Sequence, residues 1–329
     1  MPTVDRHPEA VPGTVHLVDL AGASAGGKVE LVPRPSDDPE DPLNWSHRRK
    51  YLAVAMVNIY TMGIAICFTL QNSVLADITH DTGISTEHLV QATGVTFLVC
   101  GWGCLVIQPL ALTYGRRGMY LISMLVTVPL MVWSAYSTST GEWYAHRILF
   151  GLVNSPIEAL PEVSIPDIFF AHERGAWMSV YVFTLFGFSF VSPLVAGFFA
   201  EAYGRRWTMH LGAIVAAASF VILFFFMEET MYFRPTLEGL EDETRQTDEK
   251  ATESQASMEE KKVESAVKDQ KTGTSYEKKD YIEKLKPFVK MEERPTRTQM
   301  FKSIVRPVAI IVQFPSIAWV RLIYGISLS

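Results

Sequence analysis

The sequence predicts an all-α integral membrane protein with six complete membrane-spanning helices and a partial seventh helix. The main observation is a set of apolar runs without Asp, Glu, Lys or Arg, at residues 51–75, 89–114, 119–136, 176–200 and 207–227. A helix needs roughly 20 apolar residues to cross about 30 Å of hydrocarbon. A water-soluble helix of that length keeps a polar face, so these runs indicate membrane spans.

Two further segments complete the series. Residues 143–165 form the fourth span and carry Arg147, Glu158 and Glu162. A seventh span begins near Pro307 and reaches Ser329, so we expect it to be truncated. The first span also holds Asn58, Thr61 and Gln71, the second Thr93 and Thr96, and the fourth Asn154.

The loops predict the orientation, because basic residues favour the cytosolic side. They lie before the first span and in alternate loops, at Arg48, Arg49, Lys50, Arg116, Arg117 and Arg174. This pattern places the chain's start and the loop 228–305 in the cytosol. Arg205 and Arg206 disagree, because they fall in a loop expected outside.

Four regions follow from this reading. Residues 1–50 form a cytosolic tail expected to be mostly disordered, and residues 51–227 form a six-helix bundle. Residues 228–305 mix charges with few aromatics and are expected to be a largely disordered cytosolic loop. Residues 306–329 form the first helix of a second half.

The composition excludes several other classes of protein. About half of the charged residues lie in the polar loop 228–305, so the net charge of −6 says little about partners. All three cysteines lie in apolar runs, which argues against a disulfide framework. The sequence has no phosphate-binding loop, zinc motif or redox motif. We therefore expect no enzyme, no cofactor, no metal site and no nucleic-acid partner.

Charges inside the spans are the sharpest functional signal. Each costs about 2.5–3.5 kcal/mol on insertion scales, so it usually faces a cavity or a partner. Glu158 and Glu162 are one helical turn apart, and Arg147 lies on the same face at about 16 Å from Glu158. We expect Glu158 to hold a proton at rest. Arg147 can instead extend to the outer interface, and Glu162 can be hydrated near the cytosol.

Several motifs resemble those of the major facilitator superfamily, and in particular of its fungal drug:proton antiporter-like members. Residues 41–46, DPLNWS, resemble the lead-in of those proteins, and residues 228–232, EETMY, resemble their ending after the sixth span. Residues 109–117, PLALTYGRR, resemble the cytosolic motif GxLaDrxGRR, with Leu112 at its acidic position. The resemblance covers nearly everything from Asp41 onward.

The resemblance implies gating and coupling roles for particular residues. The gating set is Gly115, Arg116, Arg117, Asp167 and Arg174. Gly115 permits the turn, and Asp167 is the nearest acid with which Arg116 and Arg117 can pair. The alternative is that the arginines only anchor the orientation. Arg147, in RxxxGxxxSP, is associated in the family with proton coupling.

The fifth span carries a stretch that resembles the antiporter motif GPxxGG. Its residues are Gly187, Ser192, Pro193, Ala196 and Gly197, with small residues in place of two glycines. Close helix approach without a role in motion is the alternative. The polar set Asn58, Thr61, Gln71, Thr93, Thr96 and Asn154 is expected at a substrate cavity, or else in hydrogen bonds between helices.

The resemblance implies proton-coupled export of small amphipathic molecules by alternating access, in a multi-pass protein of the plasma membrane. The expected partners are a small-molecule substrate, protons, the lipid bilayer and the missing C-terminal half. Two alternatives stay open: a truncated membrane protein without transport activity, and an uptake permease of the same fold.

Overall fold

The computed structural model describes residues 41–232, together with residues 18–19, 30–31, 38, 304, 313–314 and 319. The remainder of the expected tail and of the 228–305 loop lies outside the described residues. The same holds for most of the expected seventh helix, including Arg321.

The described chain is almost entirely helical. After a short 3-10 turn, η1 (Pro42–Asn44), the elements are α2 (His47–Thr69), η2 (Leu70–Val74), α3 (Leu75–Thr82), α4 (Thr86–Tyr114), α5 (Arg116–Tyr136), α6 (Thr140–Asn154), α7 (Pro156–Ile168), α8 (Ala171–Tyr203) and α9 (Arg205–Phe226). A two-residue antiparallel pair, β1 (Val18–Asp19) with β2 (Glu30–Leu31), precedes them.

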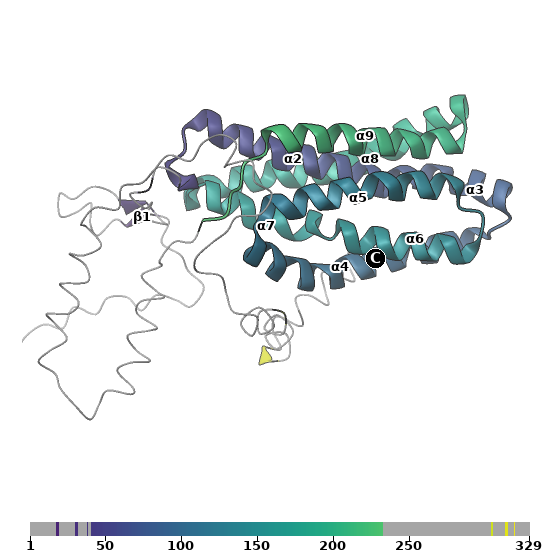
Figure 1. Cartoon of the computed structure of the whole chain (residues 1–329), viewed down its shortest axis with the longest axis horizontal. Coiled ribbons are helices and arrows are strands. Elements are labelled where there is room, and N and C mark those ends of the chain that lie inside the picture. The colour runs from purple at the N-terminus through teal and green to yellow at the C-terminus, as the bar shows by residue number, and fades with distance from the viewer. Residues whose placement is uncertain are drawn as a thin grey trace, which may run out of the picture.

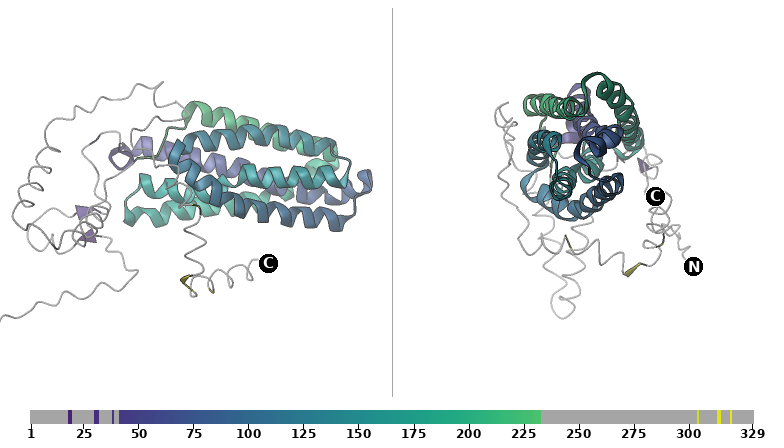
Figure 2. Two further views of the ribbon diagram at one scale, coloured as in Figure 1. Left: turned by 60° about the horizontal axis from the view of Figure 1, so that its bottom comes forward. Right: turned by 90° about the vertical axis from the view of Figure 1, so that its right-hand side faces the viewer.

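Six helical stretches within the described residues are long and apolar enough to cross a membrane. The stretch α2–η2–α3 makes one of them and α6–α7 makes another. All six run side by side as an elongated bundle (Figures 1 and 2). The predicted all-α, six-helix membrane fold is confirmed.

The spans differ from the apolar runs in two respects. Helix α2 begins at His47, before the charge-free run, so Arg48, Arg49 and Lys50 form its first turns. The fourth span changes from α6 to α7 at Ser155, because Pro156 has no N–H to continue the hydrogen-bond ladder.

Tight turns join neighbouring helices. Gly115 has φ of 103° and ends α4 directly before α5, as its sequence position predicts. Gly204 has φ of 80° and makes the equivalent turn between α8 and α9. Residues with a Cβ rarely adopt these angles, so glycine allows each chain reversal within a single residue.

Close contact between α4 and α6 depends on a glycine without a side chain. A Cβ at Gly151 of α6 would collide with the carbonyl oxygen of Thr96 in α4. Helices in lipid gain little from burying apolar surface against one another, so small residues that permit close packing matter more. This contact positions the part of α6 that carries Arg147.

Candidate functional site

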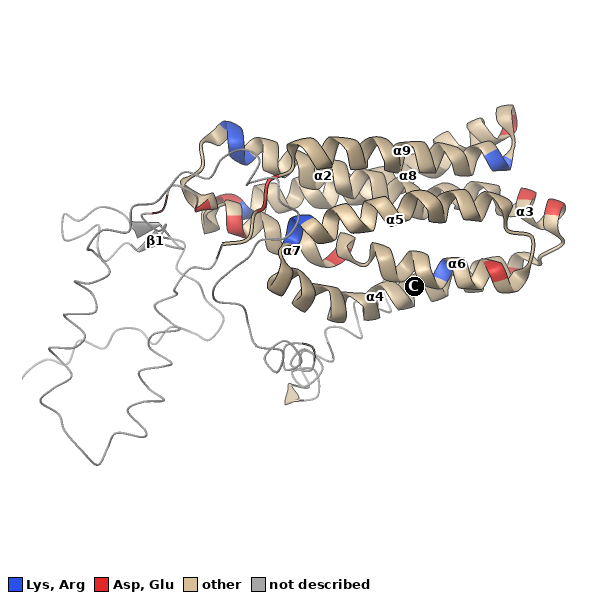
Figure 3. Ribbon diagram, viewed as in Figure 1, with Lys and Arg blue, Asp and Glu red and all other residues tan. Residues whose placement is uncertain are grey.

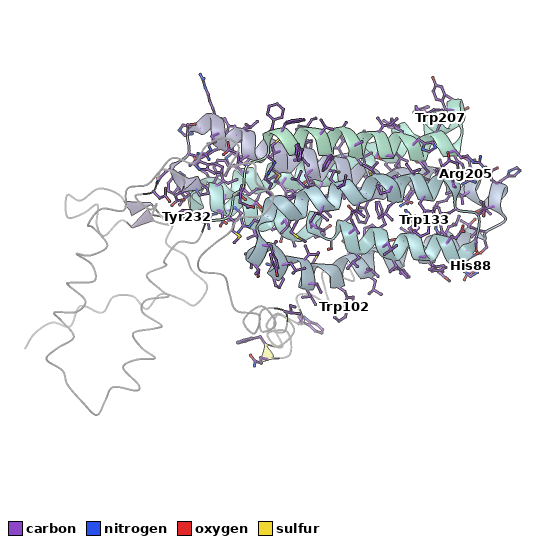
Figure 4. All side chains as sticks on the ribbon, viewed as in Figure 1. His88, Trp102, Trp133, Arg205, Trp207 and Tyr232 are labelled. Atoms are coloured by element: carbon purple, nitrogen blue, oxygen red, sulfur yellow. The ribbon has the colours of Figure 1, made fainter. Side chains whose placement is uncertain are left out.

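Charged positions lie at both ends of the bundle, with a few between (Figure 3). The ends are distinguished in Figure 4, where Tyr232 lies at one and His88, Arg205 and Trp207 lie at the other. By the pattern of basic loops, we refer to the Tyr232 end as the inner end and to the Arg205 end as the outer end.

At the inner end, Arg116 joins α5 to α7. Its Nη1 lies 2.6 Å from Oδ2 of Asp167 and donates to the carbonyl of Val163 at 3.2 Å. The Arg116 side chain is almost fully buried, and that of Asp167 is 25% exposed. The expected contact between Arg116 and Asp167 is thus present, whereas its role in gating stays a prediction.

The neighbouring arginines stabilise adjacent helix ends. Arg117 donates from Nη2 to the carbonyl of Phe224 at 2.7 Å and so joins α5 to α9. Arg174 donates from Nε to the carbonyl of Phe169 at 3.1 Å, at the turn between α7 and α8. All three arginines therefore hold the inner ends of helices together.

Sequence reasoning missed Glu229 at this inner cluster. Its two carboxylate oxygens accept hydrogen bonds from the backbone N–H groups of Arg116 and Arg117, each at 3.1 Å. These N–H groups open α5 and have no partner within the helix. Two features of the sequence could have indicated this contact. Two acidic residues follow the sixth span, and the cytosolic motif has the apolar Leu112 where an acidic residue is usual.

Glu228 makes a second link at the inner end. Its Oε2 lies 2.5 Å from Nη2 and 2.7 Å from Nε of Arg49, near the start of α2. The Arg49 guanidinium lies 4.0 Å from the ring centre of Trp45. Residues 228 and 229 together connect the chain after α9 to α2 and to α5.

Arg147 is enclosed within the bundle, with none of its surface exposed. Its Nη2 donates to Oγ1 of Thr93 in α4 at 3.1 Å, and its guanidinium carbon lies 5.1 Å from the ring centre of Trp143. Its Nε and Nη1 find no hydrogen-bond partner among the described residues. The alternative that Arg147 extends to the interface does not fit this burial.

Glu158 and Glu162 lie on α7, and both side chains are exposed. Arg147 is buried within the bundle, whereas the two carboxylates are exposed, and the common face expected for the three residues stays a prediction. The cover that α4 gives to α6 at Thr93 contributes to the burial of Arg147.

The stretch that resembles the antiporter motif packs against the first span. Ser192 donates from Oγ to the carbonyl of Ile66 at 3.1 Å, and Ser73 of η2 donates to the carbonyl of Pro193. Ala196 is buried, and a Cβ at Gly197 would lie 4.0 Å from that of Ser73. Gly187 faces open space, with nothing near its absent Cβ.

The residues expected at a substrate cavity mostly bond within the bundle. Thr61, Gln71, Thr96 and Asn154 are buried. Thr61 and Thr96 donate to carbonyls one turn earlier in their own helices, as Asn58 does. The geometry of these residues favours the alternative of packing and local hydrogen bonding.

Asn154 is the centre of a buried network between helices. Its Oδ1 accepts from Oγ1 of Thr127 at 2.7 Å and from Oγ of Ser123 at 3.2 Å, both in α5. Ser123 in turn lies 2.9 Å from the hydroxyl of Tyr60 in α2. The network fixes the end of α6 directly before the change to α7.

The outer end has an ion pair that involves Arg205, one of the two arginines that disagree with the charge pattern. Arg205 donates from Nε to Oδ2 of Asp81 at 2.8 Å and joins α9 to α3. The two residues border a hollow of about 410 Å³ that Asp77, Glu201 and Gly197 also line. Among the described residues, no group of His, Cys, Asp and Glu is placed to hold a metal ion.

A family model described as Major Facilitator Superfamily matches residues 57–329. The chain belongs to the Major Facilitator Superfamily. The family assignment confirms the predicted resemblance and identifies a multi-pass membrane protein of a transporter family, not an enzyme.

Similar members of the superfamily occur in fungi. An uncharacterized MFS-type transporter of Schizosaccharomyces pombe is 29% identical over 238 residues, which cover 70% of this chain and 41% of that protein. Protein HOL1 of Saccharomyces cerevisiae is 29% identical over 244 residues, 69% of this chain and 41% of that protein. The MFS antiporter QDR3 of Candida albicans is 24% identical over 228 residues, 69% of this chain and 32% of that protein.

This superfamily member therefore spans about two fifths of the length of the first two of these relatives, and less of the third. Among solved structures, the human organic anion transporter MFSD10 overlaps 56% of this chain and 49% of that chain, with a TM-score of 0.48 and 15% identity.

Proposed function

We propose that the six-helix bundle is one half of a plasma-membrane exporter that exchanges small amphipathic molecules for protons. The observation that carries the proposal is the pair of exposed carboxylates, Glu158 and Glu162, inside an apolar span. A membrane-embedded charge is costly and usually serves a pathway for ions or substrate. One relative, QDR3, carries the name antiporter.

In the proposed mechanism, Glu158 exchanges a proton for the substrate. Glu158 is protonated while its surroundings are apolar, and the entry of water or a cationic substrate favours the ionised carboxylate. The proton and the substrate then stabilise different facing states of the transporter, and coupling requires this difference. Arg147 contributes a fixed positive charge in the same span, and Arg116 with Asp167 closes the inner end in one of the states.

A second bundle is the proposed partner. Transporters with internal repeats bind substrate between two bundles, which rock about the site. Helix α8 has large exposed aromatics, including Phe183 at 79%, Phe190 at 78% and Phe198 at 70% exposed. The proposed second bundle covers part of this surface, and lipid covers the rest.

The test is transport of rhodamine 6G, an amphipathic cation, by the full-length protein in proteoliposomes with an imposed proton gradient. We expect dye to move against the proton flux, and we expect Glu158→Gln to abolish gradient-driven movement while passive exchange remains. Glu87→Gln, at an exposed carboxylate near the outer end, is the matched control. Full coupled transport by Glu158→Gln would exclude Glu158 as the carrier, and dye movement with the protons would favour the uptake permease.

A further inference from the structure

Helix α7 contains three prolines, at positions 156, 161 and 166. A proline has no backbone N–H, so the carbonyl four residues earlier loses its helical partner. For Pro156 and Pro161 these carbonyls belong to Leu152 and Ile157. An unpaired carbonyl in an apolar surrounding is costly, so each requires another donor.

Side-chain hydroxyls supply both donors. Ser155 donates from Oγ to the carbonyl of Leu152 at 2.9 Å, within the same span. Tyr181 donates from its hydroxyl to the carbonyl of Ile157 at 3.0 Å, and Tyr181 belongs to α8. The first bond is local, whereas the second joins two helices.

The Tyr181 hydroxyl is buried together with its ring. The side chain is 2% exposed and packs in an apolar cluster with Ile165 and Phe169 of the α7 end. A buried tyrosine hydroxyl needs a hydrogen-bond partner, and here that partner is the carbonyl released by Pro161. Ile157 directly precedes Glu158, so this bond acts on the turn of α7 that carries the carboxylate.

We propose that Tyr181 is a positioning residue, which replaces the N–H missing at Pro161 and thereby holds the Glu158 turn of α7 against α8. A proline-interrupted helix bends more readily than a regular one. The Tyr181 bond is one of the hydrogen bonds that restrain this bend, and it can break and re-form between states. Because α8 also carries Ser192 and Pro193, the bond connects movement of that helix to the position of Glu158. This consequence for transport rests on the proposed function, whereas the tether itself does not.

A double-mutant cycle between Tyr181→Phe and Pro161→Ala tests the tether. Alanine at position 161 restores a backbone N–H within reach of the Ile157 carbonyl, which makes the Tyr181 hydroxyl redundant. Tyr181→Phe should therefore loosen α7 when Pro161 is present and have little effect in Pro161→Ala. Packing of the ring alone would give the same effect in both backgrounds.

The native thiol of Cys104 reports the position of α7, because its Sγ lies 3.3 Å from the carbonyl of Ser155. With Cys67 and Cys100 replaced by serine, labelling of Cys104 by N-ethylmaleimide is followed in detergent. When Pro161 is present, we expect Tyr181→Phe to raise the labelling rate of Cys104 at least threefold. In the Pro161→Ala background, we expect the same substitution to raise that rate by less than 1.5-fold. Equal acceleration in both backgrounds, or none in either, would overturn the proposal.

Tyr120→Phe is the matched control. Tyr120 is also buried and bonds to α7, but its hydroxyl meets Oγ of Ser164 at 3.1 Å, which no proline has released. Its effect on labelling should be the same with and without Pro161. If Pro161→Ala does not yield folded protein, Pro161→Ser restores the same N–H. The labelling needs no transport, so loss of the proposed antiport activity and loss of the tether are separate results.

Discussion

Arg147 and Glu229 show how strongly the surroundings of a single charged residue determine its role. Arg147 is wholly buried, and its guanidinium makes one hydrogen bond to the described part of the chain. Glu229, by contrast, accepts bonds from four backbone N–H groups, at residues 116, 117, 230 and 231. A buried charge that is incompletely paired destabilises the fold. A carboxylate at the start of a helix stabilises it. The two residues should therefore respond oppositely to neutral substitution.

Arg147→Met should leave the melting temperature of the protein unchanged or raise it, while abolishing coupled transport. Methionine fills a similar volume without an unpaired charge, so the desolvation penalty disappears. Thermal unfolding in detergent and dye transport in proteoliposomes provide the two measurements. A fall of several degrees in melting temperature would show that the arginine is a structural requirement of the bundle.

Glu229→Ala should destabilise the bundle by about 0.5–2 kcal/mol, the usual range for loss of a helix cap. Its comparison is Glu228→Ala, which removes a partly exposed ion pair with Arg49 and should cost about 0–1 kcal/mol. Both are measured by chemical denaturation of the full chain. A larger loss in Glu228→Ala than in Glu229→Ala would contradict the capping role.

At the scale of elements, the fourth span is two helices with different surroundings. Helix α6 is held tightly against α4 and α5, through Gly151 and through the Asn154 network. Helix α7 carries three prolines and takes hydrogen-bond donors from α5 and α8. Arg147 therefore lies on the rigid helix α6, whereas the exposed carboxylates lie on the more deformable helix α7.

Gly151→Ala should sharply reduce the yield and melting temperature of the folded protein. The added methyl group would meet the Thr96 backbone, which cannot move without displacing α4. Gly94→Ala, on α4 where a Cβ meets nothing within 4 Å, is the matched control and should be tolerated. Fluorescence-detected size exclusion compares the two. Similar behaviour of both variants would mean that α4 and α6 separate easily.

At the scale of the whole molecule, each end of the bundle is held by charges from segments far apart in the chain. The inner end joins α2, α5 and α7 with the segment after α9, through the contacts of Arg49, Arg116 and Glu229. The outer end joins α3 to α9 through Asp81 and Arg205. An alternating-access transporter must open each end in turn, so such contacts are candidates for state-dependent bonds.

Asp167→Asn should impair transport by the full-length protein, because Arg116 loses the negative charge that lies 2.6 Å from its buried guanidinium. The exchange Arg116→Asp with Asp167→Arg should restore transport only in part. The exchanged pair keeps the attraction but loses the bond from Arg116 to the Val163 carbonyl. Transport is measured in proteoliposomes at equal protein amounts. Unchanged transport in Asp167→Asn would remove the gating role.

The sequence by itself determined the six spans, their order and the turn at Gly115. The thickness of the hydrocarbon layer determines how long an apolar run must be, and a positive φ requires glycine at a single position. Both constraints involve only neighbouring residues, so the sequence alone reveals them. The meeting of Arg116 with Asp167 was also predictable, since both flank spans on the same side of the membrane. Only the tertiary structure decided the burial of Arg147, the cap from Glu229 and the bond from Tyr181 to Ile157. These depend on which distant side chain reaches a given backbone group or charge, and helix packing determines that.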